Sequence, residues 1–310
     1  MELSVIVPLY NEEESLTPLY EAIVAAVAPL GITFEILFVD DGSRDKTFDV
    51  AKDLATQDPN LRVIKFRRNY GQTPAMAAGI DHAKGQVLIT MDGDLQNDPS
   101  DIPNFLEYLD KGYDIVVGWR HKREDKLITR KIPSKIANWI IGKVTGVPIK
   151  DNGCSLKAYR ADVIKNVPLY SEMHRFIPAM ASLAGTNVAE IKVKHHARQF
   201  GVSKYGLSRI YKVLLDLLTI KTIVSFASRP MLWFGMLAMP SLFISFMAIV
   251  VTIDQLFSGE GTSSSTIFGI AILFGVLGFF LLSIGSVAEL IYKTGDIKLE
   301  KLALITKKIV

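Results

Sequence analysis

Cysteine is almost absent from this chain, since Cys154 is the only one in 310 residues. An internal disulfide is therefore excluded, and the composition fits a reducing compartment. Histidine is scarce as well, with five residues, none in metal-ligand spacing; His195 and His196 are adjacent in an expected strand and would point to opposite faces. The formal net charge of +3 is modest and gives no reason to expect a nucleic acid partner.

Two common nucleotide-binding motifs are also missing. No Gly-x-Gly-x-x-Gly follows the first expected strand, which argues against a dinucleotide, and the chain has no Walker loop with its lysine. The N-terminus begins directly with a strand pattern, so we expect no signal peptide.

Long apolar runs are present only in the C-terminal third, at residues 231–253 and 267–291. Each exceeds the ~20 residues that a helix needs to cross a bilayer, so we expect two transmembrane helices rather than a buried hairpin. Lys221 and Arg229 precede the first run and five lysines follow the second, whereas the connector 254–261 has neither lysine nor arginine. The positive-inside rule then predicts a multi-pass protein of the cell (inner) membrane with both termini in the cytoplasm.

The N-terminal two thirds alternate short apolar runs with helical patterns. Such alternation predicts an α/β fold with a mainly parallel sheet covered on both faces. Thr73 is expected to cap the third helix, with Pro74 in its first turn and Gly85 past its end. The expected strands are 3–7, 34–39, 61–66, 87–90 and 114–117, and the expected helices end near Ala28, Ala55 and Gly85.

Polar residues follow four of these strands, where parallel sheets bind their ligands. The loop after the fourth strand, Asp92-Gly93-Asp94-Leu95-Gln96, is the most informative. Two carboxylates and an amide suit a hard divalent cation that takes its other ligands from water and phosphate. Together with arginines for phosphate, the four loops indicate a nucleoside diphosphate site. They are Pro8-Leu9-Tyr10-Asn11-Glu12, Asp40-Asp41-Gly42-Ser43, Arg67-Arg68-Asn69-Tyr70-Gly71 and the acidic loop.

In their order and spacing these motifs resemble the family 2 glycosyltransferases of the GT-A fold. Within that family the chain resembles the polyprenyl-phosphate glycosyltransferases, which include the dolichol-phosphate mannose synthases and bactoprenol glucosyltransferases. The resemblance covers residues 1 to about 205, and the two C-terminal spans match the bacterial branch. It implies a GT-A Rossmann-like, mainly parallel sheet at 1–205, an amphipathic juxtamembrane helix at 206–229, and two transmembrane α-helices with a basic tail at 230–310.

The resemblance also assigns roles at the donor site. Asp92, Asp94 and Gln96 are expected to hold Mg²⁺ or Mn²⁺, which bridges the two phosphates of the donor and neutralises the leaving group. For Ser43, a turn or helix cap is the preferred interpretation. The residues implied in nucleotide-sugar binding are Pro8, Tyr10, Glu12, Asp40, Asp41, Arg68, Asn69, Gly71 and Asp92.

Basic residues further along resemble the phosphate- and acceptor-binding positions of the family. A guanidinium suits this role because it pairs with phosphate oxygens through two bonds. For Arg175 and for the loop of Arg198 and Lys204, an ordinary surface position is the alternative. The implied residues are Arg120, Arg130, Arg175, Arg198 and Lys204.

The loop from Asp151 to Arg160 resembles the acceptor side of the family, although Asn152 and Ser155 stand where many members have glycine or threonine. Asp94, Arg120 and Asp151 are the residues expected to act in catalysis. A phosphate monoester acceptor has a second pKa near ~6 and is already an anion at pH 7, so Asp151 is expected to position substrate rather than act as a base. Cys154 has no His partner and is expected to be a packed thiol.

Two amphipathic segments with basic flanks, 134–147 and 207–226, are expected to lie at the membrane surface, with core packing as the alternative for the first.

The reaction implied by the resemblance is inverting transfer of a hexose, glucose from UDP-glucose by preference, to undecaprenyl or another polyprenyl phosphate. GDP-mannose, UDP-N-acetylglucosamine and an aminoarabinose donor stay open, as does a non-enzymatic membrane protein that binds nucleotide-sugars. A processive synthase would need a Gln-x-x-Arg-Trp motif and more spans, which the chain lacks. Gly275, Gly278 and Gly285 would allow close helix contact, as in a homo-oligomer, with lipid-facing glycine as the alternative, so the sequence does not define the oligomeric state.

Overall fold

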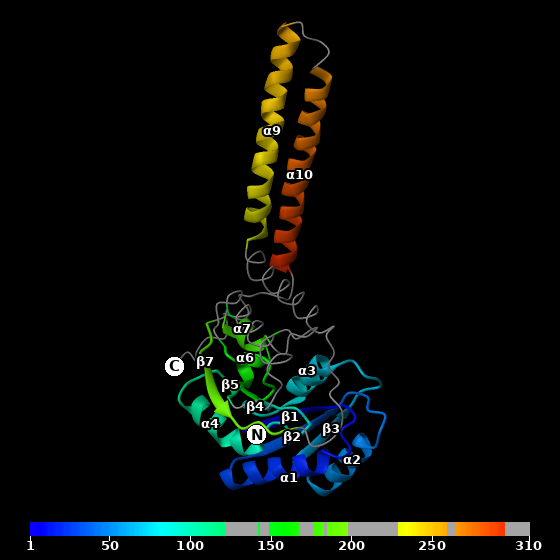
Figure 1. The fold of residues 1–310 in the computed structure, drawn as a ribbon, viewed down its shortest axis with the longest axis vertical. Coiled ribbons are helices and arrows are strands. Elements are labelled where there is room, and N and C mark those ends of the chain that lie inside the picture. The colour runs from blue at the N-terminus through cyan, green and yellow to red at the C-terminus, as the bar shows by residue number, and fades with distance from the viewer. Residues whose placement is uncertain are drawn as a thin grey trace. The chain divides into compact units, whose positions relative to one another are not determined.

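The structure is a computed structural model in which residues 1–121, 142, 149–165, 167, 176–182, 185–197, 229–258 and 264–294 are described. The described residues separate into two compact units (Figure 1). The first, called the N-terminal unit, contains every strand found in the described residues. The main described part of the second, called the helical hairpin, is α9 (Pro230–Ser258) and α10 (Ser264–Thr294).

The N-terminal unit is built on a seven-stranded sheet in the order β3-β2-β1-β4-β6-β5-β7. All neighbouring pairs are parallel except those of β6, which runs antiparallel to both β4 and β5. The strands expected at 3–7, 34–39, 61–66, 87–90 and 114–117 are confirmed, and β1, β2 and β5 run farther toward the carboxyl side than predicted. The strand expected at His195 and His196 is wrong, because β7 ends at Val193 and His195 forms an isolated bridge. The strands are β1 (Leu3–Leu9), β2 (Phe34–Asp40), β3 (Leu61–Lys65), β4 (Val87–Thr90), β5 (Ile115–Arg120), β6 (Lys157–Arg160) and β7 (Val188–Val193).

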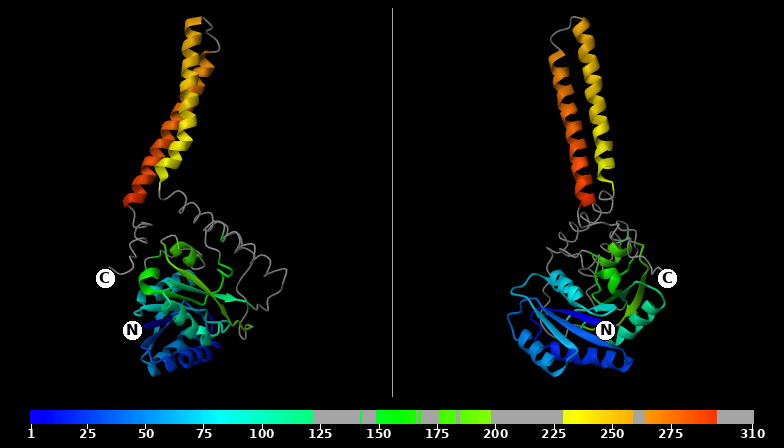
Figure 2. Two further views of the ribbon diagram at one scale, coloured as in Figure 1. Left: turned by 90° about the vertical axis from the view of Figure 1, so that its left-hand side faces the viewer. Right: turned by 180° about the vertical axis from the view of Figure 1, so that it is seen from behind.

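Helices cover both faces of the sheet (Figure 2). They are α1 (Leu16–Val27), α2 (Thr47–Gln57), α3 (Gln72–His82), α4 (Ile102–Asp110), α6 (Ala161–Ile164) and α7 (Ile177–Ser182), with the 3₁₀ turns η1 (Ala28–Leu30) and η2 (Pro99–Asp101). The predicted cap of α3 is wrong, because Gly71 is the N-cap, with φ of 101°, and the buried Thr73 lies inside the first turn. An extended backbone with positive φ suits glycine at that position.

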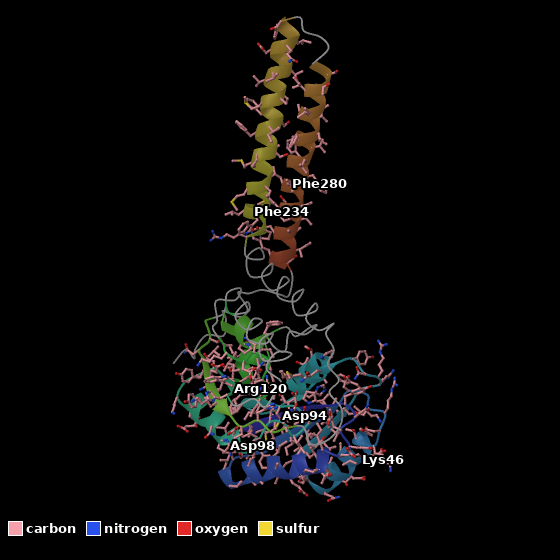
Figure 3. All side chains as sticks on the ribbon, in the orientation of Figure 1. Lys46, Asp94, Asp98, Arg120, Phe234 and Phe280 are labelled. Atoms are coloured by element: carbon pink, nitrogen blue, oxygen red, sulfur yellow. The ribbon has the colours of Figure 1, made fainter. Side chains whose placement is uncertain are left out.

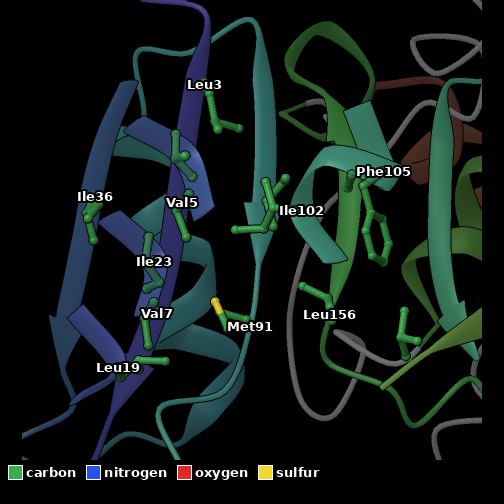
Figure 4. Close-up of a cluster of buried hydrophobic side chains, with 14 of the residues drawn as sticks. Leu3, Val5, Val7, Leu19, Ile23, Ile36, Met91, Ile102, Phe105 and Leu156 are labelled. Carbon is green, nitrogen blue, oxygen red and sulfur yellow. The ribbon is translucent and has the colours of Figure 1, made fainter. Parts of the chain in front are cut away.

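Alternation along β1 assigns its side chains to the two faces. Leu3, Val5 and Val7 pack in one cluster with Ile23 of α1 and Phe105 of α4, all fully buried (Figure 4). On the opposite face α3 packs very closely on the strand. A Cβ at Gly79 would lie 2.3 Å from Cγ2 of Ile6, so only glycine permits this approach. The N-terminus of α3 is thereby fixed at the carboxyl edge of the sheet.

The helical hairpin is apolar along both of its helices. They contain 29 and 31 residues, and at about 1.5 Å per residue each exceeds the ~30 Å of a hydrocarbon core. Both are long and apolar enough to cross a membrane, and few of their residues are buried inside the structure. Apolar side chains project outward around both helices, Phe280 among them (Figure 3). This agrees with the two predicted transmembrane helices.

Polar side chains join the two helices of the hairpin. Ser241 donates a hydrogen bond to the carbonyl of Phe274 at 2.8 Å, and Ser245 donates one to the carbonyl of Ala271 at 2.7 Å. A Cβ at Gly275 would lie 2.9 Å from Oγ of Ser245, so this glycine allows the close contact. Small and hydroxylated residues at the helix contact are typical of membrane helix pairs.

Candidate active site

The carboxyl ends of β1, β2, β3, β4, β5 and β7 lie at one edge of the sheet. Residue pairs such as Leu9↔Asp40 and Asp40↔Lys65 place successive strand ends side by side. Because β6 is reversed, it begins at this same edge, where Lys157 pairs with Thr90 and Val117. The acidic loop after β4 and the residues 151–156 before β6 therefore meet at the carboxyl edge.

The loops after β1 and β2 are fastened to each other by backbone-to-side-chain hydrogen bonds. The N–H of Asn11, a residue with φ of 51°, donates to Oγ of Ser43 at 3.0 Å, and the N–H of Arg44 donates to Oδ1 of Asn11 at 2.9 Å. The N–H of Glu12 donates to Oγ1 of Thr47 at 2.8 Å. Of the turn and helix cap preferred for Ser43, the cap is wrong, because the N-cap of α2 is Lys46. The N–H of Ser43 bonds Asp40 in a turn, and its hydroxyl holds the two loops together.

Asp40 is fully buried at the end of β2 and carries an unsatisfied acceptor. Its Oδ1 accepts a hydrogen bond from the N–H of Ser43 at 3.0 Å. Its Oδ2 is buried and has no hydrogen-bond partner within the described ranges. Buried carboxylate oxygens are normally hydrogen-bonded, so this atom suits an N–H donor from a ligand, such as the imide of a nucleobase.

Asp41, unlike Asp40, has hydrogen-bond partners for both carboxylate oxygens. Its two oxygens accept hydrogen bonds from the backbone N–H groups of Tyr70 and Gly71, at 2.7 and 2.8 Å. Burial, the largest influence, raises the pKa of Asp41, although the two N–H groups act to lower it. These bonds fix the loop after β3, so Asp41 supports that loop; its predicted contact with a nucleotide stays a prediction.

The loops after β2 and β3 pack closely against each other. Gly42 has φ of 68°, and a Cβ there would lie 2.4 Å from the backbone carbon of Arg68. The exposed Tyr70 ring contacts Phe66 edge-on and lies beneath the Arg68 guanidinium at 4.8 Å. Arg68, Asn69 and Gly71 therefore lie at the carboxyl edge as predicted.

The acidic loop is held in a defined shape. Oδ1 of Asp92 accepts a 2.6 Å hydrogen bond from Nε2 of Gln72, and Oδ1 of Asp94 accepts one at 3.2 Å from the N–H of Gln96. Leu95, between them, has φ of 59°. A Cβ at Gly93 would lie 2.6 Å from Cδ2 of Leu9, so glycine lets the loop pack against the end of β1.

The composition of this loop fits a hard divalent cation. Asp92 and Asp94 offer carboxylate oxygens and Gln96 an amide oxygen, which are the ligand types that Mg²⁺ and Mn²⁺ accept. In the described part of the chain, no group of three or more His, Cys, Asp or Glu side chains is arranged to hold an ion. A cation at this loop would complete its shell with water and phosphate oxygens.

Gln96 also connects the acidic loop to the segment after β7. Its carbonyl accepts a hydrogen bond from the N–H of His196 at 2.9 Å, and Asn97 forms an isolated bridge with His195. The next residues, from Arg198, lie outside the described residues.

Arg120 and Asp151 form a buried ion pair. Nε of Arg120 lies 2.7 Å from Oδ2 of Asp151, and Nη2 lies 2.8 Å from Oδ1. The two side chains are 14% and 4% exposed. Burial acts to lower the pKa of Arg120, but the hydrogen bonds and charge of Asp151 outweigh it and raise that pKa. Both oxygens of Asp151 are thus engaged by a permanently charged partner.

The charge of Asp92 acts on the same guanidinium and contributes to the raised pKa of Arg120. Asp94 and Arg120 are labelled in Figure 3. The loop of Asp151 is also joined to the acidic loop by a hydrogen bond from Nδ2 of Asn97 to Oγ of Ser155, at 2.6 Å. The three residues expected to act in catalysis, Asp94, Arg120 and Asp151, are therefore in one region of the fold.

Cys154 and Lys157 lie beneath this region. Cys154 is 1% exposed, and burial raises its pKa to about 11. Its thiol is therefore protonated at neutral pH, in agreement with the predicted packed thiol. Lys157 is buried as well, and its Nζ donates to the carbonyl of Asn152 at 3.3 Å. These contacts support the loop of Asp151 from below.

Several predicted positions lie outside the described residues. They are Arg130, Arg175, Arg198 and Lys204, together with most of segment 134–147 and the whole of segment 207–226. Of the remaining predicted site residues, Pro8, Tyr10 and Glu12 lie at the end of β1 and just beyond it. The hydroxyl of Ser15 links Glu12 to the acidic loop, since it lies 3.1 Å from Oε2 of Glu12 and 2.8 Å from the carbonyl of Gly93.

Gln72 and Asn97 were not predicted from the sequence, yet both bind loop residues of the site. Gln72 follows the Arg68–Gly71 motif by one residue, and Asn97 follows the acidic loop by one. Their positions next to two recognised motifs were the only signal in the sequence. Their partners, Asp92 and Ser155, are distant in the chain.

The fold of the N-terminal unit is that of a GT-A glycosyltransferase. Among solved structures, the glucosyl-3-phosphoglycerate synthase of Mycobacterium tuberculosis, in complex with Mn²⁺ and uridine-diphosphate-glucose, is similar with a TM-score of 0.55 and 14% identity, over 71% of this chain and 78% of that chain. At that identity the similarity concerns the fold alone.

The family model described as Glycosyl transferase family 2 matches residues 4–167. The chain belongs to this family, which confirms the resemblance predicted from its motifs. The dodecaprenyl-phosphate galacturonate synthase of Rhizobium johnstonii is 42% identical over 301 residues, covering 95% of this chain and 88% of that protein. The undecaprenyl-phosphate 4-deoxy-4-formamido-L-arabinose transferase of Edwardsiella ictaluri is 37% identical over 292 residues, covering 93% and 88%.

Proposed function

We propose that this glycosyltransferase moves a sugar from a nucleoside diphosphate to a polyprenyl phosphate at the bacterial inner membrane. One observation carries the proposal: the acidic loop and the Arg120–Asp151 pair occupy one edge of a GT-A sheet in a chain that also has two membrane-length helices. Two relatives of nearly full coverage, from Rhizobium johnstonii and Edwardsiella ictaluri, are both named for a polyprenyl-phosphate acceptor.

The donor sugar is the less defined part of the proposal. The relatives are named for galacturonate and for 4-deoxy-4-formamido-L-arabinose, so the predicted preference for glucose from UDP-glucose has no support among them. We therefore place a uronate and a formamido-arabinose donor ahead of glucose, with GDP-mannose and UDP-N-acetylglucosamine behind.

The donor would bind along the carboxyl edge of the sheet. The unpartnered Oδ2 of Asp40 would accept from the base, and Asp41 would keep the loop of Arg68 and Asn69 in place beside it. Asp92, Asp94 and Gln96 would hold Mg²⁺ or Mn²⁺, which as a Lewis acid neutralises charge on the leaving diphosphate. The related fold that binds Mn²⁺ with a uridine-diphosphate sugar is consistent with this placement.

The chemical step needs no protein base. A phosphate oxygen of the lipid attacks the anomeric carbon from the face opposite the diphosphate, the bond from that carbon to the diphosphate breaks, and its electron pair leaves with the nucleoside diphosphate. The configuration inverts. The acceptor is already ionised at pH 7, since the second pKa of a phosphate monoester is near ~6. Asp151 binds the guanidinium of Arg120 and would hold that side chain in position. Nη1 of Arg120 has no hydrogen-bond partner among the described residues and would face phosphate.

For the whole chain we propose the predicted division into a catalytic domain at 1–205, a juxtamembrane segment at 206–229 and membrane helices at 230–310. Lysine and arginine flank the hairpin on the outer sides of its two helices, so the positive-inside rule favours a cytoplasmic catalytic domain and cytoplasmic termini. Nucleotide-sugars would then reach the site from the cytoplasm.

The test is direct. Purified full-length protein is incubated with undecaprenyl phosphate, Mg²⁺ or Mn²⁺ and a panel of nucleotide-sugars, namely UDP-galacturonate, UDP-4-deoxy-4-formamido-L-arabinose, UDP-glucose, GDP-mannose and UDP-N-acetylglucosamine. We expect one of them to give a lipid-linked sugar, and Asp94→Asn to abolish its formation while leaving the protein in membranes.

Nucleotide-sugar binding without any lipid-linked product, across all five donors and with Mg²⁺ and Mn²⁺ in turn, would instead favour a non-enzymatic binding protein. Product formation by Asp94→Asn at the native rate would reject the metal assignment.

A further inference from the structure

Gln72 is the first residue of α3 and binds a side chain that the proposed function assigns to the metal. Its amide Nε2 donates a 2.6 Å hydrogen bond to Oδ1 of Asp92. The contact joins the loop after β3 to the loop after β4. We propose that Gln72 is a positioning residue that orients Asp92 toward the divalent cation and thereby sets the affinity of the site for it.

The amide is held in place from two directions. The carboxylate of Asp41 accepts the N–H groups of the two residues that precede Gln72, so the start of α3 is fixed. The body of α3 is fixed by the close approach of Gly79 to Ile6 of β1. A donor on so constrained a backbone selects one orientation of its partner carboxylate. Groups in this relation to a metal ligand typically alter metal affinity by 10–100-fold when removed.

The chemistry of the donor matters as much as its position. A lysine or arginine in place of Gln72 would bring a positive charge to the carboxylate and compete with the cation. The neutral amide orients Asp92 and leaves its negative charge for the metal. Arg120, whose guanidinium Asp92 influences electrostatically, is itself paired with Asp151.

This inference rests on the proposed function, so the experiment distinguishes failure of the role of Gln72 from failure of the metal assignment. Mn²⁺ binding to the full-length protein is titrated in the presence of saturating UDP, with free Mn²⁺ read by electron paramagnetic resonance. Gln72→Met keeps the length of the side chain and removes the amide. Gln86→Met is the matched control. It makes the same change at an exposed glutamine that directly precedes β4, at the end of the strand away from the acidic loop.

We expect Gln72→Met to raise the dissociation constant for Mn²⁺ by 10–100-fold and Gln86→Met to leave it within twofold. Transfer by Gln72→Met should recover at high Mn²⁺, because the carboxylate is still present. Should Gln72→Met fail to fold, Gln72→Ala tests the same amide with a residue of high helix propensity.

Equal Mn²⁺ binding by native protein and both Gln72 variants would overturn the role of Gln72 alone. Failure of the native protein to bind Mn²⁺ would overturn the metal assignment and the role of Gln72 with it. Loss of transfer in Gln72→Met that persists at saturating Mn²⁺ would also contradict the proposal, since it would place Gln72 elsewhere in the reaction.

Discussion

The buried pair of Arg120 and Asp151 allows a quantitative prediction. Two N–H···O contacts of 2.7 and 2.8 Å join side chains that are 14% and 4% exposed. Removing one partner of such a pair leaves the other charge buried without compensation, which costs about 3–5 kcal/mol. The loop also closes over the pair, because a Cβ at Gly153 would lie 3.2 Å from Nη2 of Arg120. We therefore expect Arg120→Met and Asp151→Asn each to destabilise the fold by that amount.

The double variant should cost less than the sum of the two single variants, by at least about 2 kcal/mol, because it removes both charges together. Thermal unfolding of the full-length protein at a fixed scan rate measures all three. At roughly 2–4 °C per kcal/mol, each single variant should lower the midpoint by roughly 6–20 °C.

The exposed pair of Glu107 and Lys111 is the matched control, since its charges lie equally close, at 2.6 Å, but in solvent. Glu107→Gln, Lys111→Met and their combination should show no measurable coupling.

Strictly additive losses at Arg120 and Asp151 would refute the reasoning. So would an Asp151→Asn variant of native stability that has lost transfer activity, because that result would favour Asp151 as a base over Asp151 as the partner of Arg120.

Three further predictions concern other parts of the chain. Gly42→Ala combines a strained φ with a clash against the backbone of Arg68 and should cost about 1–3 kcal/mol in unfolding experiments, whereas Gly31→Ala, with similar φ and open space, should cost only the strain. Glu35 is buried, which acts to raise its pKa, but hydrogen bonds from the N–H of Lys84, from Ser4 and from Arg62 lower that pKa overall. The stability that these bonds provide is present above the unfolded pKa near ~4.3 and is lost as pH falls through the lower folded pKa. The stability of the native protein should therefore fall more steeply than that of Glu35→Gln between pH 6 and 3. Ser245→Ala removes a hydrogen bond between α9 and α10 and should lower stability in mixed micelles by about 0.6 kcal/mol, checked by detergent titration of unfolding.

The sequence was sufficient to predict β1 to β5 and the edge at which the site forms. Runs such as Leu3–Val7 and Val87–Thr90 are continuous apolar segments, which are typical of buried parallel strands. Because each is followed by polar residues, the rule for parallel sheets places those residues together. Local pattern and one topological rule were enough for this part of the fold.

The reversed strand β6 could not be predicted in the same way. Its four residues, Lys157–Arg160, begin and end with a charge and form no apolar run. Its direction depends on pairing with β4 and β5, which are distant in the chain. The pairing of Arg120 with Asp151 depends on that reversal and was not visible as a contact.

Adjacent residues also received different roles that no local pattern distinguishes. Asp40 ends β2 with one oxygen unsatisfied, whereas Asp41 holds the backbone of Tyr70 and Gly71. The cap of α3 was misassigned to Thr73 because the sequence shows a good capping residue but not the positive φ of Gly71. Both differences come from tertiary contacts of the loop after β3.

The opposite direction of β6 has a consequence for how such enzymes diversify. The residues of the proposed donor site leave the sheet from the ends of β1, β2 and β4, while Asp151 and its neighbours precede β6 in the chain. The pairing of β1 with β2 and β4, which places the proposed donor residues, does not involve the stretch between β5 and β6. Under the proposed roles, selection for a new lipid would then act on one stretch of polypeptide and leave the nucleotide-recognising stretch intact.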